Sequence, residues 1–218
     1  MAPAVQRQVV LPWRQVVRIA LNSLRARFYR SLITTVSLAL AVAFVAYLWF
    51  GYDILNSMWP GADQPLKEHI LGAGYELSPD GQFGSTAKDR WLAILSLLVC
   101  VVGSVNAQLM AVTERFREIG TFKCLGALNS FVVRIFVLEA MFQGCFGGLA
   151  GGIAGTLIAA IGQVMKFGWA AFVGIPALRA PVVVGAVTLL AVALSFIGVL
   201  YPSLVAARMR PAVALRAE

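Results

Sequence analysis

The chain has 218 residues, of which 60% are hydrophobic and only 13% are charged, and its formal net charge is +8. These proportions exclude an ordinary soluble globular domain and indicate an integral membrane protein. The length leaves room for several membrane spans but not for a large additional folded domain. We therefore expect one membrane domain over residues 1–218. The positive charge requires no nucleic acid, because basic segments beside spans are selected by topology and by anionic lipids.

The first predicted element is an amphipathic helix over residues 12–30. The stretch PWRQVVRIALNSLRARF places apolar side chains at spacings of three and four residues, with arginines along one flank. This pattern is typical of a helix that lies on the inner leaflet of a membrane. Such a helix acts either as a lever that moves with the first span or as a charged anchor, and the pattern alone favours the anchor.

Four apolar runs follow, each long enough for a helix to cross a hydrocarbon core of about 30 Å. The sequence therefore predicts an all-α integral membrane fold. The predicted spans are residues 32–52, 91–112, 134–162 and 181–203, joined by segments 53–90, 113–130 and 163–180 and followed by a tail at 204–218.

Lys and Arg are concentrated in the N-terminal segment, in residues 113–130 and in the tail, whereas segment 53–90 is rich in acids. Basic segments stay on the cytoplasmic side of a membrane. We therefore expect both termini and segment 113–130 to be cytoplasmic. Segment 53–90 is then a short outer loop, able to form a helix or hairpin packed on the spans but too small for an independent domain.

The third predicted span combines an acid with two glycine rows. Rows of small residues let helices pack closely in lipid, either within the chain or against a second copy, and we expect one row to serve each purpose. The acid, Glu139, is a candidate for a mechanical or an interfacial role, with Arg134 or headgroup water to neutralise it. The rows are Gly144, Gly148 and Gly152, and Gly147, Gly151 and Gly155.

The sequence lacks the catalytic and metal-binding motifs that would indicate an enzyme. It contains no GxxxxGK[ST], HExxH or GxSxG motif, so energy for any work has to come from elsewhere. The three cysteines are scattered along the chain, so we predict that they are free thiols: Cys100, Cys124 and Cys145. We predict that the single histidine, His69, is a solvated side chain in a loop. We expect a non-catalytic subunit with no bound cofactor or metal.

Three segments together resemble the FtsX/MacB-like permease family, the membrane subunits of type VII ABC systems. AVTERFREIGTFKCLGAL at 111–128 is similar to the family's ER-x-REIG segment with its following turn. VVRIFVLEAMFQGCFGGLAGGIAG at 132–155 is similar to its acid and Gly-rich third span. YPSLVAARMRPAVALRAE at 201–218 is similar to its closing motif.

The resemblance implies that a separate cytoplasmic ABC ATPase, which carries ATP and Mg, binds segment 113–128 as a coupling helix. We expect Glu114, Arg115, Arg117 and Glu118 to prolong the second span as a solvated helix, with a turn at Gly120. The residues expected to couple to the ATPase are Glu114, Arg117, Glu118, Ile119, Gly120, Thr121, Phe122, Lys123, Leu125 and Gly126.

The resemblance also implies a bacterial inner-membrane protein that pairs with a second permease, as homodimer or heterodimer, and conveys ATP-driven movement across the membrane. Relatives carry a large outer domain that loop 53–90 cannot be, so we expect an outer partner such as a membrane fusion protein. An alternative is a regulatory subunit that controls cell-wall hydrolases, with Trp59, Ile70, Leu71 and Tyr75 binding an adaptor. A further alternative is a lipid or lipoprotein extractor in contact with membrane lipids.

Overall fold

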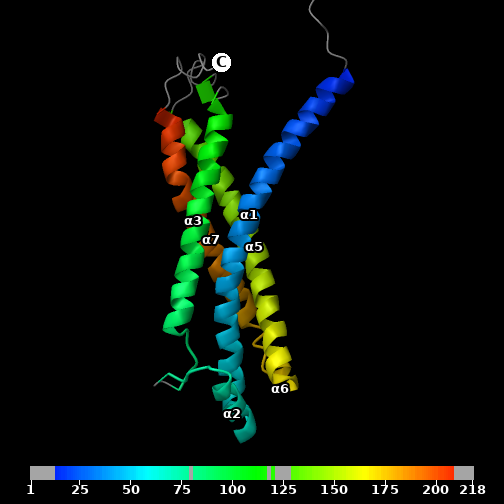
Figure 1. The fold of residues 1–218 in the computed structure, drawn as a ribbon, viewed down its shortest axis with the longest axis vertical. Coiled ribbons are helices and arrows are strands. Elements are labelled where there is room, and N and C mark those ends of the chain that lie inside the picture. Colours follow the sequence, from blue (N-terminus) through cyan, green and yellow to red (C-terminus); the bar gives the residue numbers. More distant parts are fainter. Residues whose placement is uncertain (1–12, 79–80, 117–118, 121–128, 209–218) are drawn as a thin grey trace, which may run out of the picture. The chain divides into compact units, whose positions relative to one another are not determined.

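The computed structural model describes residues 13–78, 81–116, 119–120 and 129–208. Four long helices dominate it (Figure 1): α1 (Trp13–Met58), α3 (Ala87–Glu114), α5 (Asn129–Phe167) and α7 (Arg179–Arg208). Each contains a segment long and apolar enough to cross a membrane, namely Leu32–Gly61, Ala87–Glu114, Val132–Phe167 and Arg179–Ala207. The predicted all-α fold with four spans is thereby confirmed.

The helices extend beyond the predicted spans, and two of these differences matter most. The N-terminal amphipathic segment does not end as a separate helix near residue 30, because α1 continues without a break from Trp13 to Met58. The third span extends to Phe167 instead of ending at residue 162. The chain also divides into two units between Ile33 and Thr34, and all packing described below lies within the second unit.

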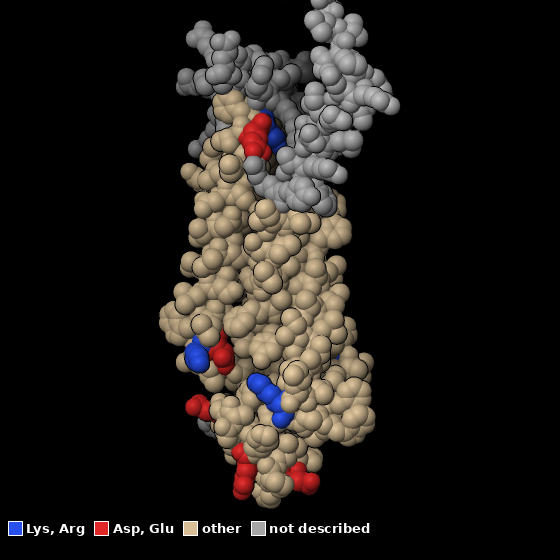
Figure 2. All heavy atoms as spheres, turned by 45° about the vertical axis from the view of Figure 1, so that its right-hand side comes forward, with Lys and Arg blue, Asp and Glu red and all other residues tan. Residues whose placement is uncertain are grey.

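A belt without charged side chains crosses this unit. Residues 34–52 of α1, 91–113 of α3, 140–165 of α5 and 180–207 of α7 contain no Asp, Glu, Lys or Arg. Figure 2 shows the uncharged belt between charged groups nearer its two ends. Because a helix rises 1.5 Å per residue, about 20 such residues match the hydrocarbon core. The belt therefore marks the membrane-embedded part of the bundle.

Helix α5 is the packing centre of the bundle. A Cβ added at Gly148 would lie 2.8 Å from the Cα atom of Thr188 in α7, and one added at Gly144 would lie 2.8 Å from the Cα atom of Val192. On the adjacent face, Cβ atoms at Gly151 and Gly155 would collide with backbone carbonyl oxygens of α1. Gly152 and Gly147 extend the two rows, toward Val184 and Val187 of α7 and toward Leu38 of α1 respectively. Both glycine rows thus face helices of the same chain.

The connection between α1 and α3 is short and folded onto the bundle. It contains a 3-10 turn (Trp59–Gly61), α2 (Gln64–Gly72) and an isolated antiparallel bridge between Leu77 and Phe83. The Asn56 amide donates to the Phe83 carbonyl oxygen at 2.9 Å and accepts from the Phe83 N–H at 2.7 Å. The side chain thereby pairs the loop backbone as a neighbouring strand would.

The predicted adaptor-binding residues of this loop do not form one exposed surface. Ile70 is fully buried, and Trp59 packs edge-on against the buried Phe83 ring with centroids 5.0 Å apart. Tyr75 is partly buried, and only Leu71 is exposed. The sequence interpretation was wrong here because apolar loop residues next to a bundle bury themselves in it.

Candidate functional site

The candidate site lies where α3 ends and α5 begins, on either side of the segment that the sequence singled out. The structure describes this segment at residues 113–116 and 119–120, and again from Asn129. Of the predicted coupling residues, Glu114 is the exposed last residue of α3, and Ile119 and Gly120 are buried. The others, Arg117, Glu118, Thr121, Phe122, Lys123, Leu125 and Gly126, lie outside the described residues.

Arg115 and Glu139 form the central contact of the site. The two terminal nitrogens of Arg115 donate to the two carboxylate oxygens of Glu139 at 2.8 and 3.1 Å. The two side chains are 27% and 32% exposed. The guanidinium carbon also lies 5.9 Å from the centroid of the Phe136 ring. A planar guanidinium that meets both oxygens at once fixes orientation as well as distance, so this pair joins the end of α3 firmly to α5.

From the sequence, we expected Arg134 or headgroup water to neutralise Glu139. The structure corrects this, because Arg134 is exposed and Arg115 is the partner of Glu139. The local spacing on one helix pointed to Arg134, whereas the actual partner is 24 residues away on another helix. Arg115 was also missing from the predicted coupling residues. An intramembrane acid such as Glu139 needs a partner, and this need could have pointed to an arginine at the end of the neighbouring span.

A second polar contact lies deeper between the same helices. The Gln108 side-chain nitrogen donates to the Gln143 side-chain oxygen at 3.1 Å, and Gln108 is only 6% exposed. Gln108 precedes Arg115 by two helical turns, and Gln143 follows Glu139 by about one. Amide side chains that bond across helices hold transmembrane packing together where water exclusion cannot. The antiparallel α3 and α5 are therefore linked at two levels.

We expected Glu114, Arg115, Arg117 and Glu118 to prolong the second span as a solvated helix, and of these Arg117 and Glu118 lie outside the described residues. Helix α3 ends at Glu114, and the Arg115 N–H donates to the carbonyl oxygens of both Ala111 and Thr113. A new helical turn follows, in which the Ile119 N–H donates to the Arg115 carbonyl oxygen at 2.9 Å. Gly120, where the sequence predicted a turn, is itself helical and buried.

Ile119 anchors this turn to the bundle. It is 5% exposed and packs in a cluster with apolar residues of α3, α5 and α7. The other buried members of the cluster are Val112, Val132, Phe136, Ala140, Val199 and Ala206. A displacement applied to the turn would therefore reach three spans through direct contact, because a close-packed cluster transmits strain.

Metal-binding and thiol chemistry find no centre in the described part of the chain. It contains no group of three His, Cys, Asp or Glu side chains able to hold a metal ion. Cys100 and Cys145 are free, Cys124 lies outside the described residues, and His69 is an exposed side chain whose ring centroid lies 5.8 Å from that of Phe167. What the site offers is mechanical linkage between helices.

Comparison with known proteins gives a consistent picture. The family model described as FtsX-like permease C-terminal matches residues 91–211, which include this site. The chain is 34% identical over 130 residues, 58% of its length, to the macrolide export ATP-binding/permease protein MacB of Salmonella paratyphi A. It is 34% identical over 147 residues, 60% of its length, to the lipoprotein-releasing system transmembrane protein LolC of Neisseria meningitidis serogroup B. An uncharacterized ABC transporter permease of Methanocaldococcus jannaschii is 36% identical over 80 residues, 36% of this chain.

The matched regions are small parts of these relatives. They cover 19% of the MacB chain, 35% of the LolC chain and 20% of the archaeal permease. The chain thus spans no more than about a third of the curated relatives that it matches, and the similarity concerns a segment of the permease part.

Proposed function

The chain belongs to the FtsX-like permease family, and from this premise we propose that it transmits ATP-driven movement from a separate cytoplasmic ATPase into its own membrane spans. It is a permease component of the ABC transporter class. Segment 113–128 is the proposed input, and the spans carry the movement to the outer face, where it performs conformational work or export.

The observation that carries this proposal is the bidentate Arg115–Glu139 pair directly at the start of the input segment. A passive connector between two spans needs no rigid link at its base, whereas a lever does. With Arg115 held by Glu139 and Ile119 buried in the bundle, force on segment 113–128 would displace α3 and α5 together.

The proposal includes partners and an orientation. The ATPase binds on the side of segment 113–128, with both termini cytoplasmic, and a second permease, either a copy of this chain or a related one, completes the complex. An outer partner such as a membrane fusion protein receives the movement, because the folded loop between α1 and α3 offers little surface for gripping a substrate. In a bacterial cell this places the complex in the inner membrane.

Affinity purification of the tagged full-length chain from its native membranes tests the proposal. We expect an ABC ATPase to co-purify, and we expect Glu118→Lys and Phe122→Ala to lose it. Arg115→Met is expected to retain the ATPase but to lose the effect of the permease on its rate of ATP hydrolysis. Lys67→Met, a change in the outer loop, serves as the control and should alter neither property.

Two results would contradict the proposal. One is the absence of any ATPase from the purified complex even after cross-linking in membranes. The other is a Phe122→Ala or Glu118→Lys variant that binds the ATPase and supports hydrolysis at the same rate as the unchanged chain. Either result would leave segment 113–128 as an ordinary helical connection.

A further inference from the structure

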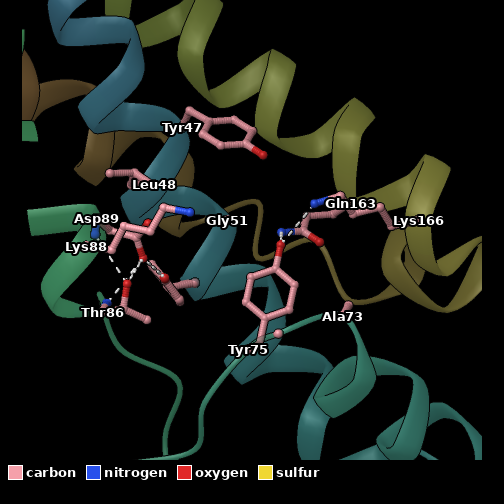
Figure 3. Close-up of a pocket in the computed structure, with 12 residues that line it drawn as sticks. Tyr47, Leu48, Gly51, Ala73, Tyr75, Thr86, Lys88, Asp89, Gln163 and Lys166 are labelled. Atoms are coloured by element: carbon pink, nitrogen blue, oxygen red, sulfur yellow. Dashed lines mark hydrogen bonds between the residues drawn. The ribbon is translucent and has the colours of Figure 1, made fainter. Parts of the chain in front are cut away.

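A polar cavity of about 360 Å³ lies at the opposite end of the bundle from the Arg115–Glu139 pair. Four parts of the chain enclose it: α1, the loop after α2, the beginning of α3 and the end of α5 (Figure 3). Its lining residues include Tyr47, Tyr52, Tyr75, Thr86, Lys88, Asp89, Gln163 and Lys166. Neither the proposed coupling function nor the family match assigns it a role.

The cavity lies at the level where the charge-free belt ends. Lys88 and Asp89 come directly before the uncharged part of α3, and Lys166 comes directly after that of α5. Lipid headgroups lie at this level of a membrane protein, where the hydrocarbon core gives way to water. Several large apolar side chains beside the cavity level are exposed, among them Trp49 and Trp91. A lipid whose tails follow these faces would bring its headgroup to the cavity.

Gln163 is the least expected group in the cavity wall. It is only 3% exposed, and its side-chain nitrogen donates to the Tyr75 hydroxyl oxygen at 3.4 Å. Its amide oxygen is buried and has no hydrogen-bond partner among the described residues. Leaving a buried acceptor without a hydrogen bond is unfavourable, because the group has lost its contact with water. The oxygen is therefore suited to accept a hydrogen bond from a molecule in the cavity.

Tyr75 and Lys166 provide the matching donors beside it. The Lys166 ammonium donates to the Tyr75 hydroxyl oxygen at 3.2 Å and lies 5.6 Å from the centroid of the Tyr75 ring. The Tyr75 oxygen thus accepts from both Lys166 and Gln163, which leaves its own proton free to be donated. The ammonium has further protons of its own. Together they can donate to an oxyanion next to the Gln163 acceptor.

Asp89 offsets one of the two positive charges that Lys88 and Lys166 bring to the lining, which leaves the cavity with a net positive charge. The Asp89 carboxylate accepts from the hydroxyl groups of Tyr52 and Thr86 and from the Thr86 N–H. In return, the Thr86 hydroxyl oxygen accepts from the Asp89 N–H at 3.2 Å, which completes a capping box at the start of α3. Lys88 and Lys166 remain as the cationic groups of the cavity, which favours an anionic ligand group.

We propose that this cavity binds the headgroup of a phospholipid, with the phosphate held by Lys166 and Tyr75 and a headgroup hydroxyl or primary ammonium donating to the amide oxygen of Gln163. The negative charge of the phosphate complements the cationic side chains, and the headgroup donor complements the buried acceptor of Gln163. A trimethylammonium headgroup supplies the phosphate but no such donor, so the cavity would discriminate against it.

Native mass spectrometry of the full-length chain in detergent tests the proposed lipid site. Equal amounts of phosphatidylglycerol, phosphatidylethanolamine and phosphatidylcholine are added to the chain. Phosphatidylethanolamine and phosphatidylcholine have the same net charge and differ in the donor. The unchanged chain should retain phosphatidylethanolamine roughly 2- to 10-fold better than phosphatidylcholine, the size of one hydrogen bond. The anionic phosphatidylglycerol should be retained at least as well as phosphatidylethanolamine.

The variants separate the two halves of the site. Gln163→Met should abolish the preference for ethanolamine over choline, whereas Lys166→Met and Tyr75→Phe should weaken retention of all three lipids and keep the preference. Gln82→Met and Lys67→Met, the same changes outside the cavity, should behave as the unchanged chain. Because no ATPase is present, the outcome is independent of the coupling proposal.

The proposal is overturned if the unchanged chain retains the ethanolamine and choline lipids equally, or if Gln163→Met keeps the preference. Soluble sn-glycerol 3-phosphate distinguishes the source of the phosphate. If it binds the chain in a Lys166-dependent way while the lipids show no selectivity, the cavity takes a free phosphate ester and the lipid assignment is wrong. Displacement of a selectively retained lipid by this compound at high concentration would support the shared chemistry.

Discussion

Arg115 and Glu139 meet through two parallel hydrogen bonds that join the end of α3 to α5. Replacing Glu139 with Gln should remove the charge that orients the guanidinium and lower the free energy of unfolding by about 1–3 kcal/mol. Arg115→Met should cost a similar amount, because it leaves the carboxylate without its partner. Thermal unfolding in detergent, followed by tryptophan fluorescence, measures both effects.

The double variant decides whether the pair acts as a unit. Arg115→Met combined with Glu139→Gln should cost clearly less than the sum of the two single changes, since the second change removes a group already deprived of its partner. Strict additivity of the two effects would mean that Arg115 and Glu139 do not stabilise the protein as a pair. That result would contradict the proposed rigid link at the base of the input segment.

Gly151 should tolerate no side chain. A Cβ there would overlap the backbone of Ala39 in α1, so Gly151→Ala has to push the two helices apart. We expect a loss of about 1–3 kcal/mol from overpacking, read as a lower thermal midpoint. Gly103→Ala and Gly185→Ala are matched controls on other spans, because a Cβ at either position meets no atom within 4 Å. Equal behaviour of all three variants would contradict the close approach of α5 to α1.

Asn56 should control how firmly the loop between α1 and α3 is held. Asn56→Ala leaves the N–H and carbonyl groups of Phe83 without their partner, and Phe83 is only 3% exposed. The expected cost is about 1–3 kcal/mol, and amide hydrogens around Phe83 should exchange faster in hydrogen–deuterium exchange mass spectrometry. Gln82→Ala, an exposed change next to it, should leave exchange unaltered. Unchanged exchange in the Asn56 variant would show that other contacts hold the loop.

The proposed orientation is open to a labelling test in intact cells. A cysteine introduced at Gln82, an exposed loop position, should react with a membrane-impermeant maleimide without permeabilisation. A cysteine introduced at Lys123 should react only after the membrane is opened. The unchanged chain, with its own three cysteines, sets the background. The reverse pattern would place segment 113–128 outside and remove the basis for ATPase coupling.

Several features could be predicted from the sequence because they depend on local composition. Each of the four predicted apolar runs lies within one long helix, since each run between charged residues is long enough to cross the hydrocarbon core. The glycine rows of α5 were recognisable from their four-residue repeat. Which helix each row would meet was not, because the rotation of α5 relative to α1 and α7 depends on all three helices at once.

The candidate site shows the same division. The importance of Glu139 followed from the cost of placing an acid near a membrane core, but the groups expected to neutralise it were Arg134 on the same helix or headgroup water. The true partner, Arg115, follows the last residue of α3 and lies 24 residues away from Glu139 in the sequence, so only the tertiary structure brings the two together. Gln108 and Gln143 drew no attention in the sequence, since single amides in apolar runs carry no spacing signal.

By itself, the sequence determined that this chain is a four-span helical membrane protein, because in lipid every backbone group has to be paired within a helix and the length of each apolar run decides where that helix crosses. Only the tertiary structure decided that Arg115 holds Glu139, that both glycine rows are occupied within the chain, and that Gln163 presents a buried acceptor to a cavity. These features depend on the rotation and register of helices far apart in sequence, and no local pattern specifies either.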